Sequence, residues 1–160
     1  MVIKIYTDGA CSNNPGPGGY AALICMNNET IKVSGFEENT TNNRMELTAV
    51  VNALSRILDM IFQDDIKVEK LEIISDSAYV VNAVNQKWIT LWETNNFVNS
   101  KCERVKNEDL WKQLIVIIKT IEFVNMELVF TKVKGHSGDY FNEMVDKMAK
   151  EQITNNLKNM

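Results

Sequence analysis

The chain opens with Val2-Ile3-Lys4-Ile5-Tyr6-Thr7-Asp8-Gly9, and this stretch decides the fold. Its apolar residues form a short run that ends at a glycine, a pattern typical of a buried β-strand. Asp8 stands at the tip of that strand. An acid there has an ordinary explanation, because aspartate is common where strands end and turns begin. Three later acids in positions predicted to be buried, Glu46, Asp76 and Asp146, favour a functional site instead.

The composition indicates a single globular domain spanning residues 1–160. Hydrophobic residues make up 45% of the chain and charged residues 24%, and 160 residues are enough to enclose a sizeable core. The net charge of -4 argues against a polyanionic partner, unless positive charge is concentrated locally or supplied by metal ions. Any nucleic-acid interface must therefore find its positive charge in one of these two ways.

The cysteines and the hydropathy pattern bear on the compartment. Cys11, Cys25 and Cys102 are far apart and lack the spacing of a zinc site or a disulfide framework. The chain starts without a charged-then-apolar leader, and its apolar runs are too short to span a membrane. We therefore expect a cytoplasmic protein that does not bind membranes.

The hydrophobic periodicity predicts five strands and several helices. Residues 10–19 contain both prolines and four of the seven glycines, which predicts a tight loop. Residues 62–70 form a polar connection. Further strands are expected at residues 20–26, 30–36, 71–75 and 127–133, and helices at residues 43–60, 77–84, 107–122 and 139–157.

This order of elements brings the four acids together. A strand that follows a helical crossover usually runs parallel to its predecessor, so Asp76 is expected beside Asp8 at one edge of the sheet. Glu46 flanks the apolar stripe of its helix and points inward, although a glutamate in a first turn also complements the helix dipole. Asp146 shares a helix face with Ala149 and Ile153.

Four carboxylates in one pocket repel one another and call for counter-charge. Because the ligands are oxygens, without a cluster of histidine or cysteine, the expected ions are Mg²⁺ or Mn²⁺ and not zinc. Two such ions about 4 Å apart form the site used for in-line phosphodiester hydrolysis. One ion prepares the attacking water and the other stabilises the leaving oxygen.

Two further features suggest chemistry but have ordinary alternatives. Residues 85–106 interleave aromatic side chains with a modest excess of cations, which suits stacking on a nucleic acid. Trp88 and Trp92, four residues apart, would equally suit a helical core. His136, the only histidine, lies in a loop between two glycines and favours a proton-transfer role, although a lone histidine is more often structural.

Seven motifs, in order along the chain, resemble those of type 1 ribonuclease H: YTDG (6–9), NPGPGG (14–19), TNNRMEL (41–47), SDS (75–77), KNEDLW (106–111), VKGHSG (133–138) and NEMVD (142–146). The resemblance covers nearly the whole chain. It implies an α/β ribonuclease H fold, a five-stranded mixed sheet flanked by helices. It also implies endonucleolytic cleavage of the RNA strand of RNA–DNA hybrids by two Mg²⁺ ions, with Mn²⁺ as a substitute, leaving 5′-phosphate and 3′-hydroxyl ends.

The resemblance also implies roles by position. Four acids match the family's metal ligands: Asp8, Glu46, Asp76 and Asp146. His136 matches a loop histidine thought to assist proton transfer or product release. Four residues match positions that approach the minor groove, where 2′-hydroxyls distinguish RNA from DNA: Cys11, Asn14, Asn42 and Asn43. Thr41 and Asn107 match a pocket that holds a phosphate of the DNA strand. Trp88 matches an aromatic that packs against that strand, and Asn142 matches a residue near the active site.

The chain departs from the family at several positions. Ala78 stands where many members have a longer side chain that touches the RNA, and Asn39 where many have an arginine beside the DNA phosphate. Residues 85–106 resemble the family's basic protrusion but hold fewer cations, so we expect weak, strongly salt-dependent affinity. The connection at residues 61–70 is longer than in compact bacterial members.

Two alternatives accompany this interpretation. The ribonuclease H domain of a reverse transcriptase shares the four acids, but the initial Met and the lack of a polymerase segment favour a free-standing bacterial-type protein. A hybrid-binding module that has lost catalysis is expected to lack at least one acid, and here all four are present with the histidine. We expect a monomer, because the sequence predicts no exposed apolar stripe.

Overall fold

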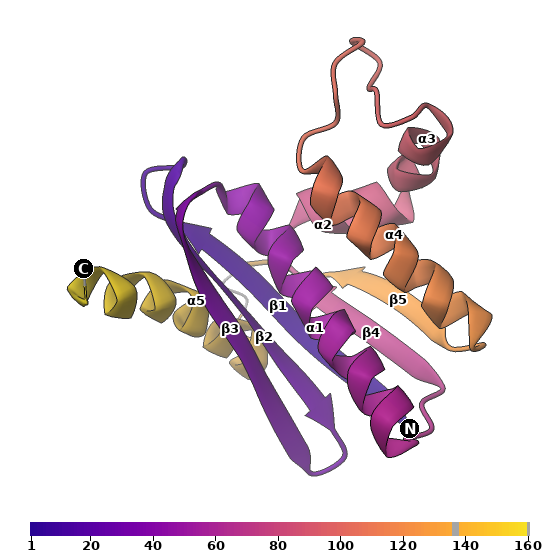
Figure 1. Cartoon of the computed structure of the whole chain (residues 1–160). Coiled ribbons are helices and arrows are strands. Elements are labelled where there is room, and N and C mark those ends of the chain that lie inside the picture. Colours follow the sequence, from indigo (N-terminus) through magenta and orange to yellow (C-terminus); the bar gives the residue numbers. More distant parts are fainter. Residues whose placement is uncertain (136–137, 160) are drawn as a thin grey trace.

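Five strands form one mixed sheet in the computed structural model, which describes residues 1–135 and 138–159 (Figure 1). The strand order is β3-β2-β1-β4-β5. β1 pairs with β2, and β2 with β3, in antiparallel fashion, whereas β1, β4 and β5 pair in parallel. The predicted α/β class and mixed sheet are confirmed. The strands are β1 (Val2–Cys11), β2 (Gly16–Met26), β3 (Glu29–Thr40), β4 (Lys70–Ser75) and β5 (Glu127–Lys132).

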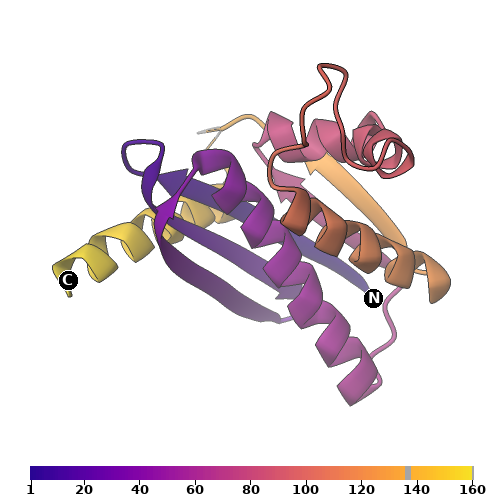
Figure 2. The ribbon, with the colours of Figure 1, turned by 45° about the horizontal axis from the view of Figure 1, so that its top comes forward.

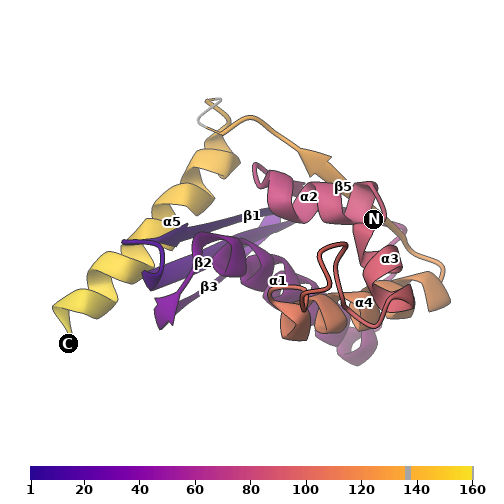
Figure 3. The same ribbon diagram turned by 90° about the horizontal axis from the view of Figure 1, so that it is seen from above.

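Helices lie on both faces of this sheet. Helix α5 (Tyr140–Lys158) covers one face, and the other helices lie on the opposite side, as Figure 3 shows. Within residues 1–135 and 138–159, none of the helices is both long and apolar enough to cross a lipid bilayer. The other helices are α1 (Asn42–Asp64), α2 (Ala78–Asn85), α3 (Trp88–Thr94) and α4 (Glu108–Phe123).

The alternation of side chains along β1 explains why both faces are covered. Ile3 and Ile5 point into the larger core, which is completed by residues of α1, α2 and α4. Tyr6 points the other way, into a smaller core that contains Val145 and Ala149 of α5. Successive side chains of a strand point to opposite faces, so β1 is buried on both sides of the sheet.

Two connections differ from the sequence prediction. Residues 16–19 were expected in a loop, but β1 continues to Cys11 and Gly18 pairs with it. Pro17 is tolerated there because it lies at the irregularity in the β2–β3 register between Gly16 and Gly18, where the ladder does not need its missing N–H. Helix α1 also continues past residue 60, since no glycine or proline interrupts it before Asp65, whose left-handed φ of 51° ends the helix.

The aromatic segment resolves into α3 and a loop that is mostly exposed but buries Phe97 and Val105 in the larger core. Trp92 packs half-buried against the larger core, with its ring 5.3 Å from that of Trp111. Trp88 is 39% exposed, so the core interpretation holds for Trp92 and leaves Trp88 free to make contacts. The chain after α3 projects away from the body of the molecule (Figure 2).

Candidate active site

The parallel pairing of β1 with β4 places Asp8 and Asp76 side by side. Thr7 pairs with Ser75, and each acid directly follows its strand residue. The two side chains therefore meet where the parallel pairing of β1 and β4 ends, side by side as predicted. Asp8 does not stand at the tip of its strand as predicted, because pairing with β2 continues β1 to Cys11. Ser77 then turns the chain into α2, because its hydroxyl oxygen accepts the Val80 N–H at 3.2 Å.

Glu46 reaches the same place from the second turn of α1. Thr41 caps this helix by accepting the Arg44 N–H at 3.2 Å. Gly9 allows the helix to approach, since a Cβ built on Gly9 would lie 2.4 Å from the Glu46 nitrogen. The Glu46 side chain is only 6% exposed. A substitution at Gly9 would therefore displace Glu46 from Asp8.

The three carboxylates form a compact cluster. One oxygen from each of Asp8, Glu46 and Asp76 lies within 4.8 Å of the others. Burial raises the pKa of Asp8 to about 7, and the charge of Asp76 adds to the effect. Burial raises the pKa of Glu46 well above its usual range, and the charge of Asp8 contributes next. Without a cation, the cluster holds its negative charge unfavourably.

The Glu46 carboxylate has an oxygen without a hydrogen-bond partner in the described part of the chain. Among the described residues, its buried Oε2 has no hydrogen-bond donor. The raised pKa of Glu46, caused first by burial and next by the charge of Asp8, favours its protonated form. At higher pH, a cation bound by three oxygen ligands would compensate fully, and carboxylate oxygens are the ligands that hard divalent cations prefer. Asp8, Glu46 and Asp76 therefore fit a divalent metal ion.

The fourth predicted acid, Asp146, stands apart from this cluster. Its oxygens are not within the 4.8 Å grouping found among the described residues. Its side chain is 31% exposed, and its Oδ2 lies 3.0 Å from Nζ of Lys150, one turn further along α5. Its charge still contributes to the raised pKa of Asp8. Asp146 therefore lies at the border of the site, partly neutralised by a lysine.

The predicted proton-transfer residue, His136, lies outside the described residues. Gly135, the residue before it, lies against the cluster. A Cβ built on Gly135 would be 3.0 Å from Oδ2 of Asp76. The loop that carries the histidine thus leaves the sheet beside Asp76.

The residues predicted at the minor groove gather at one edge of the cluster. The Asn42 N–H donates to Asn14 Oδ1 at 2.9 Å, which ties the β1–β2 turn to the start of α1. Cys11, a free thiol, lies 3.3 Å from the Thr40 carbonyl oxygen. Asn42 and Asn43 line a shallow hollow that is also lined by Glu46, Asp76, Ala78 and Tyr79.

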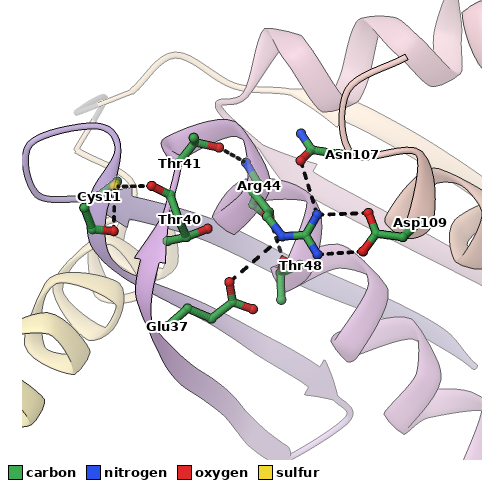
Figure 4. Close-up of polar contacts among 9 residues, drawn as sticks. Cys11, Glu37, Thr40, Thr41, Arg44, Thr48, Asn107 and Asp109 are labelled. Carbon is green, nitrogen blue, oxygen red and sulfur yellow. Dashed lines mark hydrogen bonds and ion pairs between the residues drawn. The ribbon is translucent and has the colours of Figure 1, made fainter. Parts of the chain in front are cut away.

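A charged network that the sequence analysis missed joins the start of α1 to the start of α4, as Figure 4 shows. Arg44 holds Asp109 through two hydrogen bonds, Nη1 to Oδ1 at 3.0 Å and Nη2 to Oδ2 at 2.6 Å. Its Nη1 also donates to Asn107 Oδ1 at 3.3 Å. The hydrogen bonds raise the pKa of Arg44 and lower that of Asp109. An arginine in a first helical turn, which the helix dipole disfavours, was the available signal.

The remaining predicted residues lie on separate elements. Thr41 and Asn107, the two positions expected to bind a phosphate, both contact Arg44, Thr41 at its backbone N–H and Asn107 at its guanidinium group. Trp88 lies on α3. Asn142 is buried in the first turn of α5, one turn before Asp146.

The geometry first defines a class, an α/β protein whose sheet edge carries a carboxylate cluster suited to divalent cations. The family model for RNase H matches residues 1–154. Ribonuclease H of Thermoanaerobacter sp. (strain X514) is 44% identical over 157 residues, which cover 98% of this chain and 93% of the relative. Ribonuclease H of Caldicellulosiruptor saccharolyticus is 45% identical over 151 residues, 94% of this chain and 95% of the relative.

A solved structure agrees with the relatives. LC11-RNase H1 in complex with an RNA/DNA hybrid superimposes with a TM-score of 0.71 at 25% identity, covering 97% of this chain and 99% of that chain. The chain therefore belongs to the ribonuclease H family.

Proposed function

We propose that this protein is an endoribonuclease that hydrolyses the RNA strand of RNA–DNA hybrids and leaves 5′-phosphate and 3′-hydroxyl ends. The observation that carries the proposal is the buried cluster of Asp8, Glu46 and Asp76, in which Glu46 Oε2 has no donor among the described residues. The relatives named ribonuclease H, and the hybrid bound by LC11-RNase H1, support the choice of substrate.

The acids are assigned to metal binding. Asp8, Glu46 and Asp76 would hold one divalent cation, and Asp146 would join Asp8 in holding a second after releasing Lys150. Mg²⁺ is the expected ion, with Mn²⁺ as a substitute, because every ligand is an oxygen. When bound, such ions activate the attacking water and stabilise charge on the leaving oxygen. We assign proton transfer or product release to His136.

Recognition of the hybrid is assigned to the surfaces beside the cluster. Cys11, Asn14, Asn42 and Asn43 would read the minor groove, where the 2′-hydroxyl is both donor and acceptor. Thr41 and Asn107 would hold a phosphate of the DNA strand. Trp88, exposed on α3, would pack against that strand. Asn142 would support the site from α5.

The affinity for the hybrid is expected to be weak. Arg104, one of the few cations of the projecting segment, is paired with Glu108. Lys119 of α4 is paired with Glu93 of α3. Cations that are already paired neutralise phosphates less effectively.

One assay tests the proposal directly. Three labelled duplexes of one sequence, RNA–DNA, RNA–RNA and DNA–DNA, are incubated with Mg²⁺, with Mn²⁺ and with EDTA. Cleavage confined to the RNA strand of the hybrid and dependent on metal is the expected result. If the hybrid is bound but stays intact with both metals, the protein is a non-catalytic hybrid-binding module.

Two expectations stay predictions at this point: a monomeric state and a cytoplasmic location. Light scattering coupled to size-exclusion chromatography measures the first. Fractionation of the source cells, followed by detection of the protein, measures the second.

A further inference from the structure

The side-chain amide of Asn107 is hydrogen-bonded to Arg44 on one side and to Tyr79 on the other. Neither Arg44 nor Tyr79 has a role in the proposed function. Arg44 Nη1 donates to Asn107 Oδ1 at 3.3 Å. Asn107 Nδ2 in turn donates to the hydroxyl oxygen of Tyr79 at 3.0 Å. Figure 4 shows the amide oxygen of Asn107 facing the guanidinium group and its nitrogen pointing away.

The orientation of this amide follows from the chemistry of its neighbours. A guanidinium group has donors only, so the atom of Asn107 that faces Arg44 must be the oxygen. The nitrogen must then face Tyr79. The reverse orientation would bring the amide N–H groups against the guanidinium N–H groups and leave both without acceptors.

Both neighbours of Asn107 are themselves fixed. Arg44 is held by the two hydrogen bonds to Asp109. The Tyr79 hydroxyl accepts a second hydrogen bond, from Nε1 of Trp111 at 3.0 Å, and the two rings lie 5.4 Å apart. Trp111 is completely buried. The amide of Asn107 is therefore clamped between a surface ion pair and the core.

In the part of the chain that the structure describes, two hydrogen-bond donors beside Arg44 remain unused in this arrangement. One N–H of Asn107 goes to Tyr79, and the contacts among the described residues give the other no acceptor. Thr41 uses its oxygen to accept the Arg44 N–H, which leaves the hydroxyl hydrogen available. The remaining N–H of Asn107 lies beside the guanidinium group of Arg44, and a donor next to a cation suits an anionic oxygen.

We propose that Tyr79 and Arg44 are positioning residues, which orient Asn107 so that its remaining N–H donates to a backbone phosphate of the bound hybrid. This inference rests on the proposed function, because it presumes a nucleic-acid substrate. It adds that the hydroxyl group of Tyr79, and not only its ring, sets the affinity for that phosphate.

The variant Tyr79→Phe tests the inference, since it keeps the ring against Trp111 and removes the acceptor that Asn107 shares with Trp111 Nε1. We expect KM for the hybrid to rise about fivefold and kcat to stay within about twofold, because one hydrogen bond contributes on the order of 1 kcal/mol. Tyr20→Phe, the same substitution on β2, is the matched control and leaves KM unchanged.

A second readout separates positioning from a general loss of stability. Single phosphates of the DNA strand are replaced by neutral methylphosphonates, and KM is measured for each hybrid. In the unmodified protein one position should raise KM. In Tyr79→Phe the effect of that position should shrink, and in Asn107→Ala it should vanish, as expected for coupled groups.

Two results would overturn the inference, and they have different meanings. If Tyr79→Phe raises KM equally for every hybrid and keeps the full methylphosphonate effect, the hydroxyl serves stability alone. If the unmodified protein cleaves none of the hybrids, the proposed function fails, and the positioning role fails with it.

Discussion

Two polar clusters diverge from the first turns of α1, and they have opposite character. Arg44, on one side, pairs its charge with that of Asp109 at 3.0 and 2.6 Å and donates to the Asn107 amide at 3.3 Å. Glu46, two residues later, points to Asp8 and Asp76 in a cluster of like charges. Thr41, the cap of this helix, positions both.

The difference separates scaffold from site. The charges of Arg44 and Asp109 are paired without a ligand, so this pair stabilises the folded chain as it stands and holds Asn107 beside it. Asp8 and Glu46 of the acidic cluster are buried, and like charges at such a place persist only where the surrounding fold overcomes their repulsion. The β1–β4 pairing and the two cores beneath it supply that stability. A cation would reverse the sign of the cluster's contribution.

The largest effect is expected from Asp8→Asn, which removes a central ligand of the cluster. Cleavage of the hybrid should fall on the order of 10³-fold or more, because a metal ligand contributes several kcal/mol to the transition state. The metal-free variant should also be more stable than the unmodified protein near pH 8, because one buried charge is gone. Initial rates and thermal unfolding in EDTA measure the two effects.

Asp59→Asn is the matched control for this variant. Asp59 is an exposed acid on the same helix as Glu46, and its replacement should change neither rate nor stability. Retention of substantial activity in Asp8→Asn would contradict the assignment of the site. Loss of stability in EDTA would contradict the repulsion argument.

The pH dependence of stability is the next largest effect. The pKa of Asp8 is raised from 3.8 to about 7 in the fold, so the native state binds its proton more tightly than the unfolded state does. The contribution of Asp8 is therefore fully present below pH 3.8 and is lost as the pH rises through about 7. The melting temperature of the metal-free protein should fall across this window.

Mg²⁺ should oppose that fall. A cation at one hundred times its dissociation constant adds about 2.7 kcal/mol of stability, equivalent to several degrees in the melting temperature. The stabilisation should be larger near pH 8 than near pH 5, because protons compete with the ion for the carboxylates. Unfolding curves with Mg²⁺ and with EDTA test this, and a stabilisation independent of pH would contradict the cluster as its origin.

The sequence predicted the strands because their burial follows simple periodicity. The sequence prediction was wrong where residues that favour loops lie in a segment that pairs with a neighbouring strand. Residues 16–19 carry glycines and a proline, which favour loops, yet pairing of Gly18 with Cys11 extends both strands. Propensity is a local quantity, whereas strand pairing is decided by the neighbour. The end of α1 was misplaced for a related reason, because polar residues after Met60 do not themselves stop a helix.

The site was predictable where topology alone fixed it. Asp8 and Asp76 follow paired parallel strands, and Glu46 faces the core from an amphipathic helix, so periodicity located all three. The Arg44–Asp109 pair joins residues 65 positions apart, and no periodic pattern connects them. The pairing of Asp146 with Lys150 depends on rotamers, which the sequence does not specify.

The smallest effect should come from Asp109→Asn, and its dependence on pH should run opposite to that of the acidic cluster. Arg44 and Asp109 are 30% and 57% exposed, so solvent screens the pair, and its loss should lower stability by at most about 1 kcal/mol. Because the hydrogen bonds from Arg44 lower the pKa of Asp109, its contribution is present above the unfolded pKa of 3.8 and is lost as the pH falls through the lower folded value. The variant and the unmodified protein should therefore converge in acid, where the metal-free acidic cluster is most stable. Thermal unfolding with and without Mg²⁺ measures this, and a deficit that changes with Mg²⁺ would show that the two clusters are coupled through α1 and are not independent.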